Sequence, residues 1–317
     1  MHKIGSLKLS GEVLLAPMAD YTNVAFRTLC KEYGAALVYT ELISAKALIM
    51  KSKKTEQMLL VSKDEKPIFL QLFGNDPLDF EKAINFIEKK YFDSFAGYDL
   101  NCGCSVPKAL KGSYGCSIME EPQNVGHIIS SMKKSTKKPV TLKMRLGLKK
   151  ENFIEVAKEA CNNGVDAITL HPRFGEQGYG GKANWEKIFE LYNEVDVPII
   201  GNGDIKNPED ILKMKKETNC DFVMVGRAAI GNAFFFKQAN SLLSRKQILG
   251  KKFSDFVQEG EKFIQLAEEY NLGPNDVRPY FIGLAKGLVG ASVLRNRFGL
   301  AKSVDEMKLI FEQHFQI

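Results

Sequence analysis

The chain is poor in the features that mark secreted, membrane-spanning and disulfide-stabilised proteins. Its 317 residues include only six cysteines, which is too few for a disulfide scaffold. No run of eighteen apolar residues occurs, so we expect no membrane-spanning helix. The N-terminus, MHKIGSLKLSGEV, lacks the apolar core of a signal peptide. Together these absences predict a cytoplasmic protein that works in a reducing compartment and has no membrane partner.

The chain also lacks a metal-binding pattern and a dinucleotide fingerprint. Cys102 and Cys104 are separated by one residue, and Cys116 follows twelve positions later, whereas structural zinc sites often use C-x₂-C pairs. We therefore expect no metal. The segment GYGGKA (178–183) fits G-x-G-x-x-A, but it follows a polar loop and not a strand, so a Rossmann-type site is not expected.

Short apolar segments alternate with amphipathic helical segments over the first part of the chain. Candidate strands lie at 13–18, 36–41, 67–74, 97–102, 139–147, 167–173, 198–203 and 222–227. Eight strand–helix units predict an α/β fold, a (β/α)₈ TIM barrel over residues 1–244, with an open doubly wound sheet as the alternative. Residues 253–317 show only helical periodicity, which predicts a small C-terminal all-helical domain.

Polar residues gather where the predicted strands end, and a TIM barrel places its active site at that face. Gln71, Asn101, Lys143 and His171 are examples. Burying such side chains without partners costs about 2–7 kcal/mol each. We therefore expect them to hydrogen-bond either to one another or to a shared ligand at the barrel mouth.

Two glycine-rich turns end the last two predicted strands, GNGDI (201–205) and GRAAIGN (226–232). In barrels this pair of loops commonly forms a phosphate site from backbone N–H groups and a helix N-terminus, and Arg227 adds a charge-assisted fork. A phosphate site beside Gln71, Asn101 and Lys143 favours a planar, hydrogen-bonding cofactor such as FMN. A lysine next to N1 and O2 of the flavin would stabilise its anionic reduced form.

Six ordered motifs resemble those of the FMN-dependent tRNA-dihydrouridine synthases, which reduce uridine to 5,6-dihydrouridine in tRNA. The segments are LAPMADYTNVAFR, DLNCGCSVPK, LKMR, LHPRFGEQGYGGKANW, PIIGNGDI and MVGRAAIGN. The resemblance implies NADPH or NADH as electron donor. Ser105 departs from the family's usual proline. The implied cofactor-binding residues are Pro17, Met18, Ala19, Gln71, Lys143, His171, Asn202, Gly203, Asp204, Gly226 and Arg227.

Cys104 aligns with the family's catalytic cysteine. Reduction of the uracil C5=C6 bond needs a hydride at C6, which N5 of reduced flavin would supply, and a proton at C5. An ordinary thiol titrates at about 8.5 and is mostly protonated at neutral pH, so Cys104 can donate that proton as a general acid. The other five cysteines are interpreted as buried apolar side chains.

A tRNA substrate would need a basic surface, because a uracil in folded tRNA must be flipped into the barrel mouth. Residues 277–303 carry five basic side chains and no acidic one, and the net charge of the chain is +6. Asn101 would position the base, and Lys108 is either a phosphate contact or a solvated side chain. The other predicted substrate-binding residues are Arg173, Tyr179, Arg278, Arg295 and Arg297.

Two other functions fit parts of the sequence. An FMN-barrel oxidoreductase acting on a small pyrimidine such as dihydroorotate would share the phosphate turns, but it would not explain the basic helical segment. A barrel that binds RNA without catalysis would explain the basic segment, but it would not need Cys104, Lys143 and His171 together.

Overall fold

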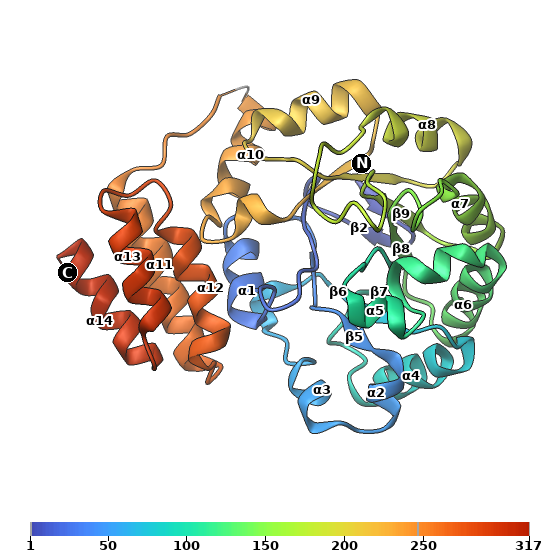
Figure 1. Ribbon diagram of the computed structural model, residues 1–317, viewed down its shortest axis with the longest axis horizontal. Helices are drawn as coiled ribbons and strands as arrows, with labels where there is room; N and C mark the ends of the chain where they lie inside the picture. Colours follow the sequence, from blue (N-terminus) through green and yellow to red (C-terminus); the bar gives the residue numbers. More distant parts are fainter. Residues whose placement is uncertain (1, 246, 317) are drawn as a thin grey trace.

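The computed structural model describes residues 2–245 and 247–316. A barrel of parallel strands is surrounded by helices, and a helical bundle lies beside it (Figure 1). The strands are β1 (Lys3–Ile4), β2 (Leu7–Lys8), β3 (Val13–Leu15), β4 (Val38–Tyr39), β5 (Ile43–Ser44), β6 (Ile68–Phe73), β7 (Gly97–Cys102), β8 (Val140–Met144), β9 (Ala167–Leu170), β10 (Ile199–Asn202) and β11 (Phe222–Val225).

Helices α1 to α10 accompany the barrel, and α11 to α14 form the bundle. The short 3₁₀ helices are η1 (Lys63–Glu65), η2 (Gly115–Glu120) and η3 (Arg227–Ala229). The α-helices are α1 (Val24–Glu32), α2 (Ala45–Ile49), α3 (Lys53–Gln57), α4 (Pro77–Lys90), α5 (Pro107–Lys111), α6 (Pro122–Ser135), α7 (Phe153–Asn162), α8 (Glu186–Glu194), α9 (Glu209–Thr218), α10 (Phe234–Arg245), α11 (Phe253–Glu269), α12 (Pro274–Leu284), α13 (Ala291–Leu300) and α14 (Val304–Phe315).

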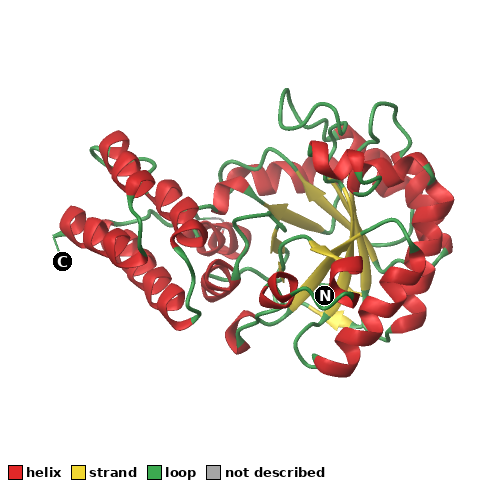
Figure 2. Ribbon diagram, turned by 60° about the horizontal axis from the view of Figure 1, so that its bottom comes forward, coloured by secondary structure: helices red, strands yellow, loops and turns green. Residues whose placement is uncertain are grey.

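Within residues 2–245, eight parallel strands form the barrel in the order β3, β11, β10, β9, β8, β7, β6, β4, and the short β5 extends the ladder of β6. The ring closes where Leu15 N donates to Leu37 O at 2.9 Å and Ala36 N donates to Val13 O at 2.8 Å. Figure 2 shows the strands inside the ring of helices. The predicted barrel is confirmed, and each predicted strand segment contains an observed strand.

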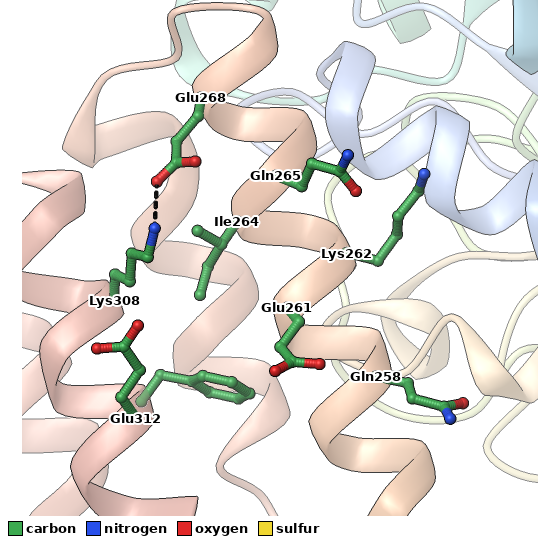
Figure 3. Close-up of a pocket in the computed structure, with 9 residues that line it drawn as sticks. Gln258, Glu261, Lys262, Ile264, Gln265, Glu268, Lys308 and Glu312 are labelled. Atoms are coloured by element: carbon green, nitrogen blue, oxygen red, sulfur yellow. Dashed lines mark hydrogen bonds and ion pairs between the residues drawn. The ribbon is translucent and has the colours of Figure 1, made fainter. Parts of the chain in front are cut away.

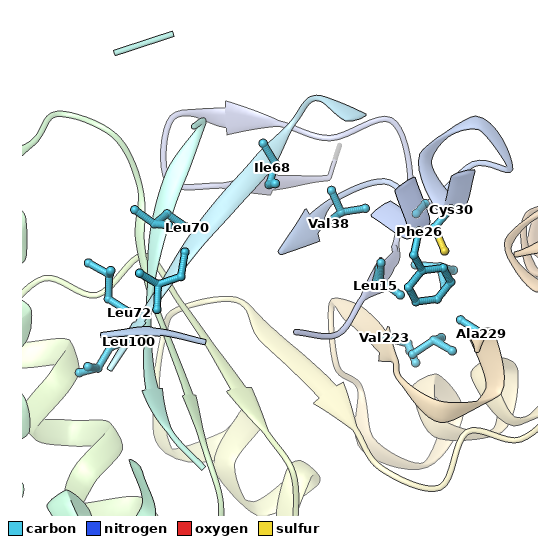
Figure 4. Packing of buried hydrophobic residues seen from close by; sticks show 14 of the residues in the cluster. Leu15, Phe26, Cys30, Val38, Ile68, Leu70, Leu72, Leu100, Val223 and Ala229 are labelled. Carbon is cyan, nitrogen blue, oxygen red and sulfur yellow. The ribbon is translucent and has the colours of Figure 1, made fainter. Parts of the chain in front are cut away.

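Side-chain alternation along the strands divides the apolar residues into two cores. Leu14 and Met224 belong to a cluster inside the barrel, whereas Val13, Leu15 and Val223 belong to the larger cluster between the sheet and the helices. Figure 4 shows part of the outer core, where strand residues meet side chains of α1 such as Phe26. The polar residues of the barrel mouth sit above the inner cluster.

The N-terminal hairpin formed by β1 and β2 was not predicted from the sequence. Its Ile4 is fully buried and belongs to the cluster inside the barrel, together with Leu9. Strands of two residues are too short to produce a periodic hydrophobic pattern. The hairpin adds apolar side chains to the barrel interior.

The bundle packs against α1 and the start of α10 (Figure 1). Tyr280 of α12 lies 5.6 Å from Phe26 of α1, measured between ring centroids. Glu259 of α11 is fully buried, and its carboxylate accepts hydrogen bonds from the backbone N–H groups of Ala233 at 2.7 Å and Phe234 at 3.3 Å. This carboxylate also binds Lys251 and the hydroxyl of Tyr280. One side chain of the bundle thus caps a helix of the barrel.

The described part of the chain contains no helix with both the length and the apolar character needed to cross a bilayer.

Candidate functional site

A cavity opens at the carboxyl ends of the barrel strands and encloses about 540 Å³ including its open mouth. Strand ends and loops after β3, β8, β9, β10 and β11 contribute to its wall. Two predicted cofactor residues, Ala19 and Gln71, are not part of the lining: Ala19 is exposed to solvent, and Gln71 is buried in the barrel. The lining residues are Ala16, Pro17, Met18, Lys143, His171, Tyr179, Asn202, Gly203, Asp204, Ile205, Met224, Gly226 and Arg227.

The turns after β10 and β11 lie side by side on one wall of this cavity. Asn202 Nδ2, at the end of β10, donates to Met224 O of β11 at 2.9 Å, just before the two turns begin. Gly203 has a φ of +117°, and a Cβ there would lie 2.8 Å from Cδ2 of His171, so only glycine fits. Arg227 stands at the rim with a 59% exposed side chain and lies 3.6 Å from Asp204. The arrangement offers backbone N–H groups and one guanidinium to an anion.

Lys143 provides a positive charge in the cavity wall. Burial, followed by the charge of Arg145, lowers the pKa of Lys143 to about 8, while Asp99 and Cys104 act in the opposite direction. No carboxylate of residues 2–245 or 247–316 forms an ion pair with its ammonium group. The ammonium group is therefore available to an electron-rich atom of a ligand in the cavity.

His171 is a neutral imidazole at this site. An arginine can only donate hydrogen bonds, so Nε2 of His171 accepts from Nη1 of Arg173 at 3.0 Å, and the imidazole proton lies on Nδ1. Burial, followed by the charge of Lys143, lowers the pKa of His171 to about 2. His171 can orient a ligand by hydrogen bonding, but it does not supply a positive charge near neutral pH.

Two buried arginines hold the loop of residues 174–183. Arg173 is 1% exposed and donates to the carbonyl oxygens of Gly180 at 3.1 Å and Gly181 at 2.8 Å. It also pairs with both carboxylate oxygens of Asp204 at 2.8 Å. Arg145 donates to the carbonyl oxygens of Phe174 and Gly178. Arg173 was predicted to bind substrate, but its hydrogen bonds are directed at this loop and its neighbours.

Asp204 also helps to hold the loop of residues 174–183. Burial acts to raise the pKa of Asp204, but the backbone N–H of Ala183 and the guanidinium of Arg173 outweigh it and lower the pKa. Oδ2 of Asp204 accepts from Ala183 N at 2.8 Å. The carboxylate thus ties the turn after β10 to the end of the loop.

The loop presents Tyr179 at the edge of the cavity. This side chain is 66% exposed, and its ring lies 4.9 Å from the guanidinium carbon of Arg227 and 5.7 Å from that of Arg145. A guanidinium over an aromatic face is a cation–π contact. Tyr179 therefore has a supported ring that a flat ligand can reach from solvent.

Cys104 lies on the loop that follows β7. Oδ1 of Asn101 accepts from the backbone N–H groups of Gly103 at 3.2 Å and Cys104 at 3.0 Å, and Cys104 O accepts from Cys116 N at 2.8 Å. Gly115 must be a glycine, because its φ is +65° and a Cβ would lie 2.4 Å from Cys104 O. Cys104 is half-buried, whereas the other five cysteines lie in the outer core or pack against it.

A chain of buried polar groups lies beneath Cys104. Asn101 Nδ2 donates to Gln71 Oε1 at 2.8 Å, and Gln71 Nε2 donates to Asp99 Oδ2 at 2.6 Å. Asp99 is fully buried, and burial raises its pKa to about 6. Sequence reasoning missed Asp99, because a charged residue inside a strand does not reveal its partners. Gln71 and Asn101 were predicted as ligand contacts, and their amides here bind each other.

The residues predicted to contact tRNA lie on two parts of the surface. Lys108 is exposed on α5, close in sequence to Cys104. Arg278 of α12 donates to Asn275 Oδ1 and to Ala301 O, so it also holds the bundle together. Arg295 is half-buried and Arg297 is exposed on α13.

A second groove lies on the bundle between α11 and α14 (Figure 3). Ile264 and Phe311 provide its apolar surface, and Lys308 pairs with Glu268 at 3.0 Å across it. Its lining includes the carboxylates of Glu261, Glu268 and Glu312 and the ammonium groups of Lys262 and Lys308. This mixed charge does not suit a polyanion. The described residues contain no cluster of His, Cys, Asp and Glu that could hold a metal ion.

Comparison with known proteins places these features in a family. Residues 14–316 match the family described as dihydrouridine synthase (Dus). A probable tRNA-dihydrouridine synthase of Aquifex aeolicus is 34% identical over 300 residues, covering 94% of each chain. A tRNA-dihydrouridine synthase B of Pasteurella multocida is 29% identical over 325 residues, covering 99% of this chain and 96% of its own.

A solved structure supports the fold alone. A variant of NCR from Zymomonas mobilis superposes with a TM-score of 0.56 at 14% sequence identity, covering 80% of this chain and 92% of its own. The family match spans the barrel and the bundle together. The chain belongs to the dihydrouridine synthase family.

Proposed function

We propose that this protein reduces uridine to 5,6-dihydrouridine in tRNA, with FMN in the barrel-mouth cavity and NADPH or NADH as electron donor. The relatives described above carry the name of this activity. The observation that carries the proposal is a single cavity lined by both glycine-rich turns and by Lys143, next in the barrel to the loop of Cys104. A tRNA substrate also implies a cytoplasmic location.

The side chains of the cavity fit FMN. The turns after β10 and β11, with Arg227, offer N–H groups and a charge to its phosphate. Lys143, whose ammonium group has no carboxylate partner among the described residues, would face the electron-rich N1 and O2 edge of the ring, and His171 would donate from Nδ1. When bound and reduced, FMN supplies the hydride that uracil takes up at C6.

The chain's own residues supply the proton and the geometry. The thiol of Cys104 gives its proton to C5 of uracil, and the resulting thiolate lies near Lys143 and Arg145, both of which interact electrostatically with it. Asn101 holds the backbone of the Cys104 loop and so fixes where the thiol lies.

We propose that tRNA contacts the rim of the cavity and the basic face of the bundle. Tyr179 offers an exposed aromatic face for the flipped base or its neighbour. Lys108, Arg295 and Arg297 would contact phosphates. We assign Arg173 to holding the loop that carries Tyr179 and not to direct substrate contact, because its guanidinium is buried and engaged.

The direct test incubates the purified protein with FMN, NADPH and tRNA that lacks dihydrouridine, and maps the reduced positions by mass spectrometry. Parallel reactions contain free uridine, orotate or NADH. We expect dihydrouridine at defined tRNA positions and negligible turnover of the free pyrimidines. Turnover of orotate without modification of tRNA would instead favour a small-pyrimidine oxidoreductase.

A further inference from the structure

We propose that Asp99 is a positioning residue for catalysis: through Gln71 and Asn101 it fixes the backbone of the Cys104 loop. The inference rests on the proposed function for its effect on turnover, while its structural part stands on the geometry alone. Asp99 is the first residue of the motif DLNCGCSVPK, but the motif assigns it no role and does not reveal its link to Cys104.

Asp99, Gln71, Asn101 and Cys104 form one continuous hydrogen-bonded chain. Asp99 and Asn101 lie two positions apart on β7, so both side chains point into the barrel. Gln71 lies on β6 in register with Asp99. Gln71 bridges the two: its Nε2 is 2.6 Å from Asp99 Oδ2, and its Oε1 is 2.8 Å from Asn101 Nδ2. The chain ends at the N–H groups of Gly103 and Cys104.

The donors and acceptors along this hydrogen-bonded chain follow one order, and the groups at its two ends fix that order. An ionised carboxylate only accepts hydrogen bonds, so it selects the amino group of Gln71, and this turns the amide oxygen of Gln71 toward Asn101. Asn101 must then present its amino group to Gln71 and its oxygen to the loop. Backbone N–H groups only donate, so they require that same oxygen. Both ends of the chain select the same amide orientations.

Asp99 is itself held in place. Thr141 of β8 donates to Oδ1 of Asp99 at 2.5 Å, and the residues are in register. Both carboxylate oxygens thus have a donor, which a buried carboxylate requires. The carboxylate cannot turn without breaking a bond on a neighbouring strand. Because the Asp99 carboxylate is fixed in the sheet, it holds Gln71 and Asn101 in place and, through them, the Cys104 loop.

Without the Asp99 carboxylate, the orientation of the Gln71 amide is selected only indirectly, through Asn101 and the backbone N–H groups of the loop. If residue 99 cannot accept a hydrogen bond, the Gln71 amide is free to rotate, and Asn101 then loses a fixed acceptor. The loop would keep the bond between Cys104 O and Cys116 N at 2.8 Å and the bond from Arg145 Nε to Gly103 O at 2.9 Å, but its N–H groups would lose a fixed acceptor. The thiol would then sample more positions, and its access to reagents would increase.

The experiment compares two substitutions at one position. Asp99→Leu keeps the shape of the side chain and removes its acceptors. Asp99→Asn keeps an oxygen for Gln71, while its amino group can donate to the Thr141 hydroxyl, so it should preserve the chain. The matched control is Thr169→Val on β9, because the buried hydroxyl of Thr169 has no partner among the described residues.

The first readout is the rate at which iodoacetamide alkylates Cys104, followed by mass spectrometry of the peptide. Half-buried Cys161 on α7 serves as the internal reference thiol. We expect Asp99→Leu to speed alkylation of Cys104 at least fivefold and to leave Cys161 unchanged. Asp99→Asn and Thr169→Val should stay within twofold of the wild-type rate. An unchanged rate of Cys104 alkylation in folded Asp99→Leu protein would refute the proposal that Asp99 positions the Cys104 loop.

The second readout separates kcat from KM in dihydrouridine formation. Asp99→Leu should lower kcat at least tenfold with KM for tRNA nearly unchanged, and Asp99→Asn should restore most of kcat. Faster alkylation with an unchanged kcat would refute the catalytic role. If the wild-type protein makes no dihydrouridine, the proposed function fails, and the alkylation result still decides the structural inference. Should Asp99→Leu not fold, Gln71→Met breaks the next link and must give the same increase in alkylation.

Discussion

At the scale of single residues, the candidate site depends on charges whose pKa values are shifted by burial. Lys143 and His171 line the same cavity, and burial lowers the pKa of each. His171 consequently stays neutral at neutral pH, whereas Lys143 is still largely protonated. Among the described residues that line the cavity, Lys143 is the cation set back from the rim, and we expect it to dominate the interaction with the electron-rich N1 and O2 edge of the flavin.

Replacing Lys143 by Met should weaken FMN binding by about 10- to 100-fold, the effect of losing a charged hydrogen bond of about 1.5–3 kcal/mol. In the wild-type protein, affinity should also fall as pH rises through about 8, because the ammonium group loses its proton. Fluorescence titration of FMN between pH 6.5 and 9.5 measures both effects. A parallel pH dependence in the Met variant would contradict the assignment to Lys143.

Asp99 provides a stability test with a defined sign. Burial raises the pKa of Asp99 to about 6, above its ordinary value near 3.9. A carboxyl with a raised folded-state pKa favours the folded state most at low pH, and this contribution is lost as pH rises through about 6. Above pH 7, the ionised Asp99 carboxylate lowers the free energy of unfolding by on the order of 3 kcal/mol.

The wild-type free energy of unfolding should therefore increase relative to that of Asp99→Asn as pH falls from 8 to 5. Urea unfolding of both proteins at several pH values measures the difference. A difference that does not change over this range would show that Asp99 keeps an ordinary pKa in the folded protein.

At this scale, sequence reasoning found which residue types gather at the mouth but not how they pair. Gln71 and Asn101 were predicted because polar residues at strand ends need partners. Their actual partners come from neighbouring strands, and a single strand pattern does not contain that information. Asp99 was missed for the same reason, and Arg173 was assigned to substrate although its guanidinium holds a loop.

At the scale of elements, strands were predicted more readily than loops. Apolar segments bounded by turn residues mark each barrel strand, because burial on both faces dictates their composition. The loop of residues 174–183 has no periodicity, and its conformation is set by Arg145 and Arg173 from elsewhere in the chain. The two-residue strands of the N-terminal hairpin are likewise invisible to periodicity.

Arg173→Lys should loosen that loop, because one ammonium group cannot replace a guanidinium that binds Gly180, Gly181 and Asp204 together. We expect trypsin to cut after exposed Lys182 several times faster than in the wild-type protein. Arg295→Lys on α13 is the matched control and should leave this rate unchanged. If the rate after Lys182 does not rise in Arg173→Lys, the loop has other sufficient anchors.

At the scale of the whole molecule, the barrel supplies the cavity, and the barrel and the bundle both supply predicted tRNA contacts. Buried Glu259 of α11 caps the start of α10, so the two parts are joined by hydrogen bonds as well as apolar packing. The sequence predicted this division from a change of periodicity. The sequence did not predict the hydrogen bonds of Glu259 to the start of α10, because a lone glutamate on a helix is usually solvated.

Arg297→Ala should weaken tRNA binding and reduce its salt dependence. Loss of one phosphate contact lowers the slope of log affinity against log salt by about 0.7 to 0.9. Lys308→Ala removes the same charge from the groove between α11 and α14, where Lys308 is already paired with Glu268, and should change the slope little. Equal effects of the two variants would indicate only a general charge effect.

The most direct test of the account is the dihydrouridine content of tRNA treated with Cys104→Ala, compared with wild-type protein and Cys161→Ala. General acid catalysis contributes about 10²- to 10⁴-fold, so Cys104→Ala should bind FMN and tRNA normally but form dihydrouridine at least about 100-fold more slowly. Cys161→Ala should retain the wild-type rate. Wild-type turnover by Cys104→Ala would contradict the proposed chemistry of the site.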